Sequence, residues 1–175
     1  MTSHAIGDTT PPPATGIPRP DADVLEIVVP FTEIPTMVGR PFRGHWLQVA
    51  RDRLTSFDHA TYIDADDGVG LDETVYPDGL VEGFHLVGLL YHLTVPVVRI
   101  SDDGWEGWNY GIDKVRFTSP VTTRDRIRAV GTVSAVEPRG NGYVVAFDSV
   151  IEVEGREKPG AVAAWRSLWR PPLAH

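Results

Sequence analysis

Apolar and polar side chains alternate with a period of two along four segments in the second half of the chain. The segments are 108–117, 126–137, 143–154 and 161–170. Turn-forming residues separate them, such as the Pro-Arg-Gly-Asn-Gly run at 138–142. Successive side chains of a strand point to opposite faces of a sheet, so the pattern predicts four strands. On 143–154 we expect one buried face and one wetter face, because Asp148, Glu152 and Glu154 all lie opposite the apolar side chains.

Two segments nearer the N-terminus have the spacing of helices. In 46–58, apolar residues from Trp46 to Phe57 recur at intervals of three and four, which is typical of a short amphipathic helix. Segment 81–95 is apolar nearly all round but too short to span a membrane, so we predict a buried helix there. Residues 63–79 lie between these helices, mix aspartate with glycine and predict a loop.

One buried helix followed by a run of long antiparallel strands indicates the α+β class. A long sheet wrapped around a single apolar helix is the hotdog arrangement, which we predict as one domain over residues 23–175; another α+β roll is the alternative. Residues 1–22 are rich in proline and carry almost no large apolar side chain. We expect them to form a disordered tail, since they cannot bury enough surface to order themselves.

Charge and composition narrow the possible partners. The formal net charge is −8, from 16 basic and 24 acidic residues. Nucleic acids and anionic membranes bind basic surfaces, so we expect neither as a partner. The chain has no cysteine, which excludes disulfides, thiolate metal sites and a cysteine nucleophile. It has neither a long apolar run nor a basic-then-apolar leader pattern, and we expect a cytoplasmic protein.

The acidic residues are concentrated in the predicted loop, where six of the 24 fall within 64–78. A cluster of carboxylates raises the question of calcium. The segment lacks the spaced ligands and the closing glutamate of an EF-hand. We therefore expect no bound metal, and nothing in the sequence calls for a cofactor.

Five segments resemble a known family in the same order along the chain. They are VGRPFRGHWLQVARDRLTSFDHAT (38–61), IDAD (63–66), LVEGFHLVGLL (80–90), NYGIDKVRFTSPV (109–121) and KPGAVAAW (158–165). Together they resemble the MaoC-like dehydratase branch of the hotdog proteins, and within it the NodN-like type. The resemblance implies a hotdog fold, a homodimer, and acyl thioesters of coenzyme A or of an acyl carrier protein as substrates. The usual reaction of the family is reversible addition of water to an enoyl thioester.

The resemblance fails where the family carries its catalytic groups. The short segment with the family's aspartate is missing after Ala60-Thr61, and Asp64 stands where the family has its histidine. Glu82 replaces a second histidine, whereas Gly83 is kept. We therefore take Asp64, Glu82 and His59 as the candidate acid and base residues.

The remaining candidates concern substrate binding. The resemblance implies that backbone N–H groups at Gly83 and Phe84 stabilise negative charge on the thioester oxygen. Candidate pocket residues are Tyr62, His85, Trp105, Trp108 and Tyr110. Each has a structural alternative: the carboxylates as solvated loop or helix-end residues, His59 on the surface, and the aromatic residues in the core or at a subunit interface.

Three functions remain open at this point. The first is a dehydratase or hydratase acting on an acyl or polyketide thioester with altered acid and base residues. The second is a biosynthetic enzyme that isomerises or cyclises a polyketide-like substrate, where placement in an apolar pocket supplies much of the rate. The third is a non-catalytic hotdog subunit.

Overall fold

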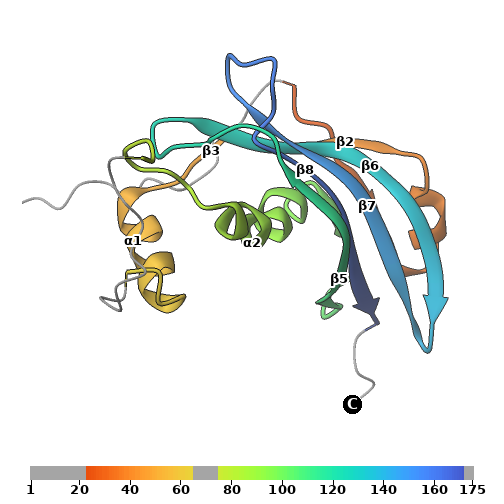
Figure 1. Ribbon diagram of the computed structural model, residues 1–175. Coiled ribbons are helices and arrows are strands. Elements are labelled where there is room, and N and C mark those ends of the chain that lie inside the picture. Colours follow the sequence, from red (N-terminus) through yellow and green to blue (C-terminus); the bar gives the residue numbers. More distant parts are fainter. Residues whose placement is uncertain (1–22, 65–74, 172–175) are drawn as a thin grey trace, which may run out of the picture.

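The computed structural model describes residues 23–64 and 75–171, and its secondary structure is that of a curved sheet with two α-helices (Figure 1). The elements are β1 (Ile27–Val29), the 3-10 helix η1 (Phe31–Met37), β2 (Pro41–Arg43), β3 (Leu47–Gln48), α1 (Arg51–Ala60), α2 (Gly83–Thr94), β4 (Val98–Ile100), β5 (Glu106–Phe117), β6 (Arg126–Arg139), β7 (Gly142–Val153) and β8 (Ala161–Arg170). The predicted tail at 1–22 and positions 65–74 of the predicted loop lie outside the described residues.

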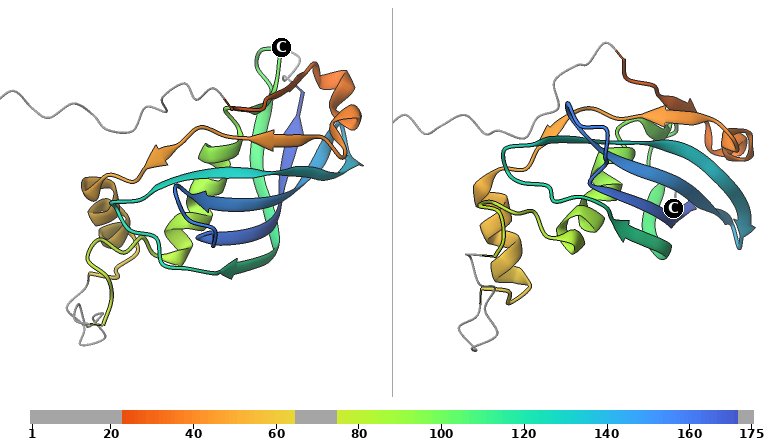
Figure 2. Two further views of the ribbon diagram at one scale, coloured as in Figure 1. Left: turned by 90° about the horizontal axis from the view of Figure 1, so that it is seen from above. Right: turned by 45° about the horizontal axis from the view of Figure 1, so that its top comes forward.

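The main sheet is antiparallel and has the strand order β2-β6-β7-β8-β5, with β3 also paired to β6. The four strands predicted from the alternating pattern are confirmed as β5 to β8. On β7 the side chains of Val145, Phe147 and Ile151 are buried on one face, while Asp148 is exposed on the other. The sheet curves around α2, which runs across its concave face, and α1 lies beyond the ends of β3 and β6 (Figure 2). The α+β hotdog prediction is therefore confirmed.

The helix predicted over 46–58 is wrong at its start, because residues 47 and 48 form β3 and α1 begins only at Arg51. Leu47 pairs with Ile127 of β6, and the Trp46 ring lies 4.2 Å from the guanidinium of Arg128. Leu47 and Val49 are buried, whereas Gln48 between them is exposed, which is the period of a strand. Tertiary pairing with β6 thus overrides a spacing that also fits a helix.

Helix α2 supplies much of the core, but it is not buried all round as predicted. Leu86, Leu90 and Leu93 face the sheet and are almost fully buried. Phe84, Gly88 and His92, at intervals of four, form an exposed stripe on the helix. A sheet that wraps around one side of a helix leaves such a stripe uncovered. No helix among the described residues is both long enough and apolar enough to span a membrane.

No hydrophobic periodicity in the sequence predicts the short elements β1, η1, β2 and β4. β1 and β4 form a separate two-stranded parallel pair, with Ile27 opposite Val98. Their buried residues, such as Ile27, Ile34 and Val98, join the same core as α2 and β7. Three-residue strands are too short for alternation to be read from sequence, so their pairing depends on this tertiary contact.

Candidate active site

The first turn of α2 is fixed in place by the segment that leads from β5 to β6. The Val81 N–H donates to the carbonyl of Val121 at 2.8 Å, and the Thr123 N–H donates to the carbonyl of Gly79 at 2.8 Å. Gly83 packs closely against β5: a Cβ at this position would lie 2.6 Å from the Phe117 ring. Gly83 therefore allows the Phe117 ring to lie directly on the helix start, which brings the helix start against the end of β5.

A groove of about 490 Å³ opens at this helix start. Glu82, Gly83 and Phe84 line it from α2, and Phe117 to Val121 line it from the end of β5 and the following segment. Its walls are mostly apolar, and no side chain caps the first turn of α2. The backbone N–H groups of a helix's first turn lack partners within the helix and attract negative charge, so a polar ligand atom can bind here.

A carboxyl pair lies beside the groove, formed by Glu82 at the start of α2 and Asp58 in the last turns of α1. The two side chains are in hydrogen-bonding contact. His85, one turn into α2, is 8% exposed, and its ring stacks on Phe57 with the ring centres 4.3 Å apart. Three buried atoms of this cluster have no hydrogen-bond partner in the structure: Asp58 Oδ1, Glu82 Oε2 and His85 Nδ1. Buried polar atoms are almost always paired, so three together mark a place for a polar ligand.

The surroundings shift the protonation of two of these groups. Burial raises the pKa of Glu82, and the charge and hydrogen bond of Asp58 raise it further, against the lowering effect of the backbone N–H of Glu82 itself. Burial lowers the pKa of His85, although the charge of Asp58 opposes the shift. The cluster therefore favours a protonated carboxyl beside a neutral imidazole. A carboxyl whose pKa is raised toward neutrality is suited to general acid–base catalysis.

The other two candidate acid–base residues lie apart from this cluster, at the C-terminal end of α1. The His59 side chain is 86% exposed, and its Nδ1 is 3.3 Å from Asp64 Oδ2. The Asp64 side chain is 47% exposed. Tyr62 is 79% exposed and has a φ of 60°, the left-handed conformation with which the chain leaves the helix. These three residues form a solvated turn. They line neither the groove at the start of α2 nor the pocket between β5 and α2.

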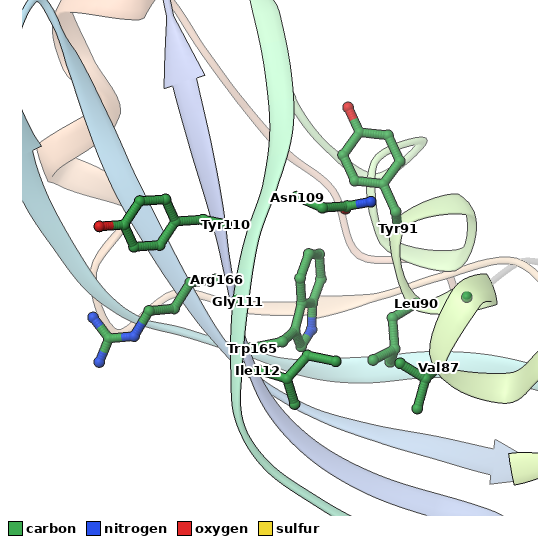
Figure 3. Close-up of a pocket in the computed structure, with 10 residues that line it drawn as sticks. Val87, Leu90, Tyr91, Asn109, Tyr110, Gly111, Ile112, Trp165 and Arg166 are labelled. Atoms are coloured by element: carbon green, nitrogen blue, oxygen red, sulfur yellow. The ribbon is translucent and has the colours of Figure 1, made fainter. Parts of the chain in front are cut away.

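The three aromatic candidates on and before β5 also lie in different places. Trp105 packs on Trp169, with ring centres 5.0 Å apart, and Trp108 is exposed on β5, where its Nε1 donates to Glu106 at 3.2 Å. Tyr110 lines a second pocket, of about 420 Å³, between β5 and α2. Figure 3 shows Ile112, Trp165, Val87 and Leu90 gathered between these elements, whereas Tyr110 and Arg166 extend on the other side of β5.

Glu82, Gly83 and His85 are candidates from the sequence that the structure brings together, whereas Asp58, which joins them, is not among the candidates and its neighbour His59 is. A usable signal was present. Leu54, Phe57 and Asp58 are spaced by three and four residues, which places Asp58 on the same helix face as the two apolar residues. His59 is one residue further along and turns away from that face. Within the described residues, no group of three or more His, Asp or Glu side chains could hold a metal ion.

Comparison with known proteins identifies relatives of this chain, although no protein-family model matches it. Nodulation protein N of Rhizobium leguminosarum bv. viciae is 26% identical over 144 residues, which are 79% of this chain and 89% of that protein. The 3-hydroxyacyl-thioester dehydratase Z of Mycobacterium tuberculosis is 48% identical over 90 residues, which are 48% of this chain. The matched region spans only 56% of the length of that dehydratase.

Solved structures share the fold at low sequence identity. A monoamine oxidase regulatory protein from Archaeoglobus fulgidus has a TM-score of 0.63 at 18% identity, over 85% of this chain and all of that one. A MaoC-like dehydratase from Rhodospirillum rubrum has a TM-score of 0.55 at 18% identity, over 78% of this chain and 94% of that one. At this identity the likeness concerns the fold.

Proposed function

We propose that the chain is a MaoC-like hotdog protein and that it catalyses hydration or dehydration of an acyl thioester. A relative named as a 3-hydroxyacyl-thioester dehydratase supports this class of substrate. The substrate is a thioester of coenzyme A or of an acyl carrier protein. The reaction interconverts a 2-enoyl and a 3-hydroxyacyl thioester.

Glu82 is the acid–base residue of this proposal. Addition of water to an enoyl thioester requires removal of a proton from water and delivery of a proton to C2 of the substrate. A carboxyl group can carry both protons if its pKa lies near the working pH, and burial beside Asp58 raises the pKa of Glu82 in that direction. The observation that carries the proposal is this protonatable carboxyl at the mouth of an apolar groove.

The first turn of α2 stabilises the charge that develops on the substrate. As C2 gains electrons, negative charge grows on the thioester oxygen, and donors aimed at that oxygen lower the barrier. The N–H groups of Gly83 and Phe84 belong to a first turn that no side chain caps. They can donate to an oxygen in the groove that both residues line.

The test is to compare Glu82→Gln with Asp64→Asn in hydration of 2-enoyl-coenzyme A. Glutamine keeps the shape of the side chain but cannot exchange the proton, so we expect a loss of about 100-fold or more in kcat. Asp64→Asn is the matched control, since Asp64 lies in the exposed turn after α1, and we expect it to retain most activity. Equal activity of the wild type and Glu82→Gln would contradict the assignment and favour catalysis by substrate placement.

We also propose that the active form is a homodimer joined along β5. This 12-residue strand is hydrogen-bonded only to β8 among the described strands, and it exposes Trp108, Ile112 and Phe117. An unpaired apolar edge strand is a template for pairing with another strand. A second copy would cover these side chains and extend the sheet.

A further inference from the structure

We propose that Asp58 and Glu82 share a single proton and act together as the acid–base centre, with Asp58 supplying the second catalytic carboxyl. The proposal rests on the proposed function, because it assigns the two proton transfers of that reaction. It replaces Asp64 and His59 as the partners of Glu82. It also makes α1 part of the active site rather than a peripheral helix.

Two carboxyl groups in contact cannot both ionise at ordinary cost, so one of them keeps its proton. Asp58 and Glu82 are in hydrogen-bonding contact, and each still has one buried oxygen without a partner, Oδ1 and Oε2 respectively. Such a pair has a carboxylate oxygen free to accept a proton and a second carboxyl able to donate one. Both functions are present at the same time, as addition of water requires.

His85 is the independent sign that a ligand belongs at this pair. Its side chain is 92% buried, and its Nδ1 has no partner in the structure. The ring is held by stacking on Phe57, which directly precedes Asp58. An unpaired buried nitrogen is unfavourable unless a ligand completes it, and a water or substrate oxygen meets this need.

The chemistry balances with one proton in the pair. In hydration the ionised carboxylate of Asp58 takes a proton from water, and the water oxygen bonds to C3. The electrons of the C2–C3 double bond move through the thioester enolate to C2, which takes the proton of Glu82. One proton enters the pair and one leaves. The proton then moves from Asp58 back to Glu82 across their contact, and dehydration follows the same steps in reverse.

The elements around the pair do not neutralise it. Arg51 at the start of α1 and Asp78 before α2 pair with each other at 2.5 Å and are both exposed. The segment from Phe117 to Val121, which forms the opposite wall of the groove, contains no titratable side chain. Asp58 is the charged side chain that acts on Glu82, and Tyr76 is the other titratable side chain that lines the groove.

The test uses full-length Asp58→Asn, with Asp52→Asn as the matched control on an exposed site of the same helix. Carboxyl titrations are followed by carbon-13 NMR, and hydration of 2-enoyl-coenzyme A is measured on the same samples. In the wild type we expect Glu82 to titrate above an ordinary glutamate. Asp58→Asn should move that titration down toward the ordinary range and lower kcat about 100-fold or more, whereas Asp52→Asn should change neither.

The reciprocal variant keeps the test decisive if Asp58→Asn does not fold. In Glu82→Gln, the raised carboxyl titration of the wild type should disappear, and hydration should fall by about the same factor as in Asp58→Asn. A Glu82 titration that is unchanged in Asp58→Asn, or full hydration activity in that variant, overturns the pair. A wild type that shows the coupled titration but hydrates no enoyl thioester overturns the proposed function while leaving the proton-sharing pair intact.

Discussion

Protonation of Glu82 affects the stability of the protein and, in the proposed mechanism, also its catalysis. Its pKa is raised first by burial and then by Asp58, so the fold favours the protonated form over the ionised one. The stabilisation by the protonated carboxyl is fully present below the unfolded-state pKa, near 4.5, and is lost as the pH rises through the higher folded-state value. A carboxyl kept in this environment destabilises the protein at a pH at which it must ionise.

Glu82→Gln should therefore increase stability at neutral pH while it abolishes most activity. The amide cannot ionise, so the variant avoids the cost of a buried negative charge beside Asp58. The gain over the wild type should grow as the pH rises above 4.5, the ordinary pKa of a glutamate, because only the wild type then has to ionise a buried carboxyl. Thermal unfolding of both proteins across this range measures the difference. A variant that is less stable than the wild type at every pH would contradict the assigned environment.

For single residues, the sequence predicts those positions in the fold that follow from local chemistry. A glycine and a carboxylate at the start of an apolar helix place Gly83 and Glu82 at a helix N-terminus without any tertiary information. The contact between Glu82 and Asp58 joins positions 24 residues apart through the packing of α1 against α2. Neither composition nor spacing fixes that contact, because it depends on how two short helices are oriented by the sheet.

Among the helices and strands, the long ones could be predicted from the sequence and the start of α1 could not. The four long strands and α2 have enough residues for their periods to be recognised, and their positions were predicted closely. The start of α1 was not, since residues 46–50 fit a helical spacing but pair with β6. The segment before β3 passes so close to the end of α2 that Gly44 is required there: a Cβ would lie 2.6 Å from the carbonyl oxygen of Leu93 and 3.2 Å from that of Ala129.

A pair of glycine substitutions tests this packing. Gly44→Ala pushes backbone against backbone on two sides, and we expect it to lower the free energy of unfolding by about 2 kcal/mol or more. Gly88→Ala is the matched control, since Gly88 lies on the exposed stripe of α2 and a Cβ there meets nothing within 4 Å. It should raise stability by about 0.5–1 kcal/mol, because alanine favours a helix interior. Urea unfolding measures both, and equal effects would contradict the close approach at Gly44.

On the scale of the whole molecule, the exposed side chains of β5 indicate a binding surface, which the net charge of −8 does not. The charge made nucleic acid an unexpected partner, but it could not indicate which surface binds a protein. The alternation along 108–117 predicted a strand. It did not predict an edge position, where Trp108, Tyr110, Ile112 and Phe117 are all exposed in the single chain. Strand order follows from long-range pairing, which no local pattern encodes.

The proposed dimer predicts a specific response to charge on this edge. Ile112→Glu places a carboxylate in the expected interface and should shift the protein from the mass of two chains to that of one. Val38→Glu is the control, because Val38 is similarly exposed but lies outside β5. Light scattering coupled to size-exclusion chromatography measures the mass. A wild type with the mass of one chain, or an Ile112→Glu variant that remains a dimer, would contradict the β5 interface.

The central claim is that this chain adds water to an enoyl thioester. The most direct measurement is to incubate the purified protein with 2-enoyl-coenzyme A substrates of several chain lengths in deuterated water, and to analyse the products by mass spectrometry. We predict a 3-hydroxyacyl thioester that carries one deuterium bound to C2, formed by the wild type and largely lost in Glu82→Gln. Absence of this product at every chain length would contradict the claim.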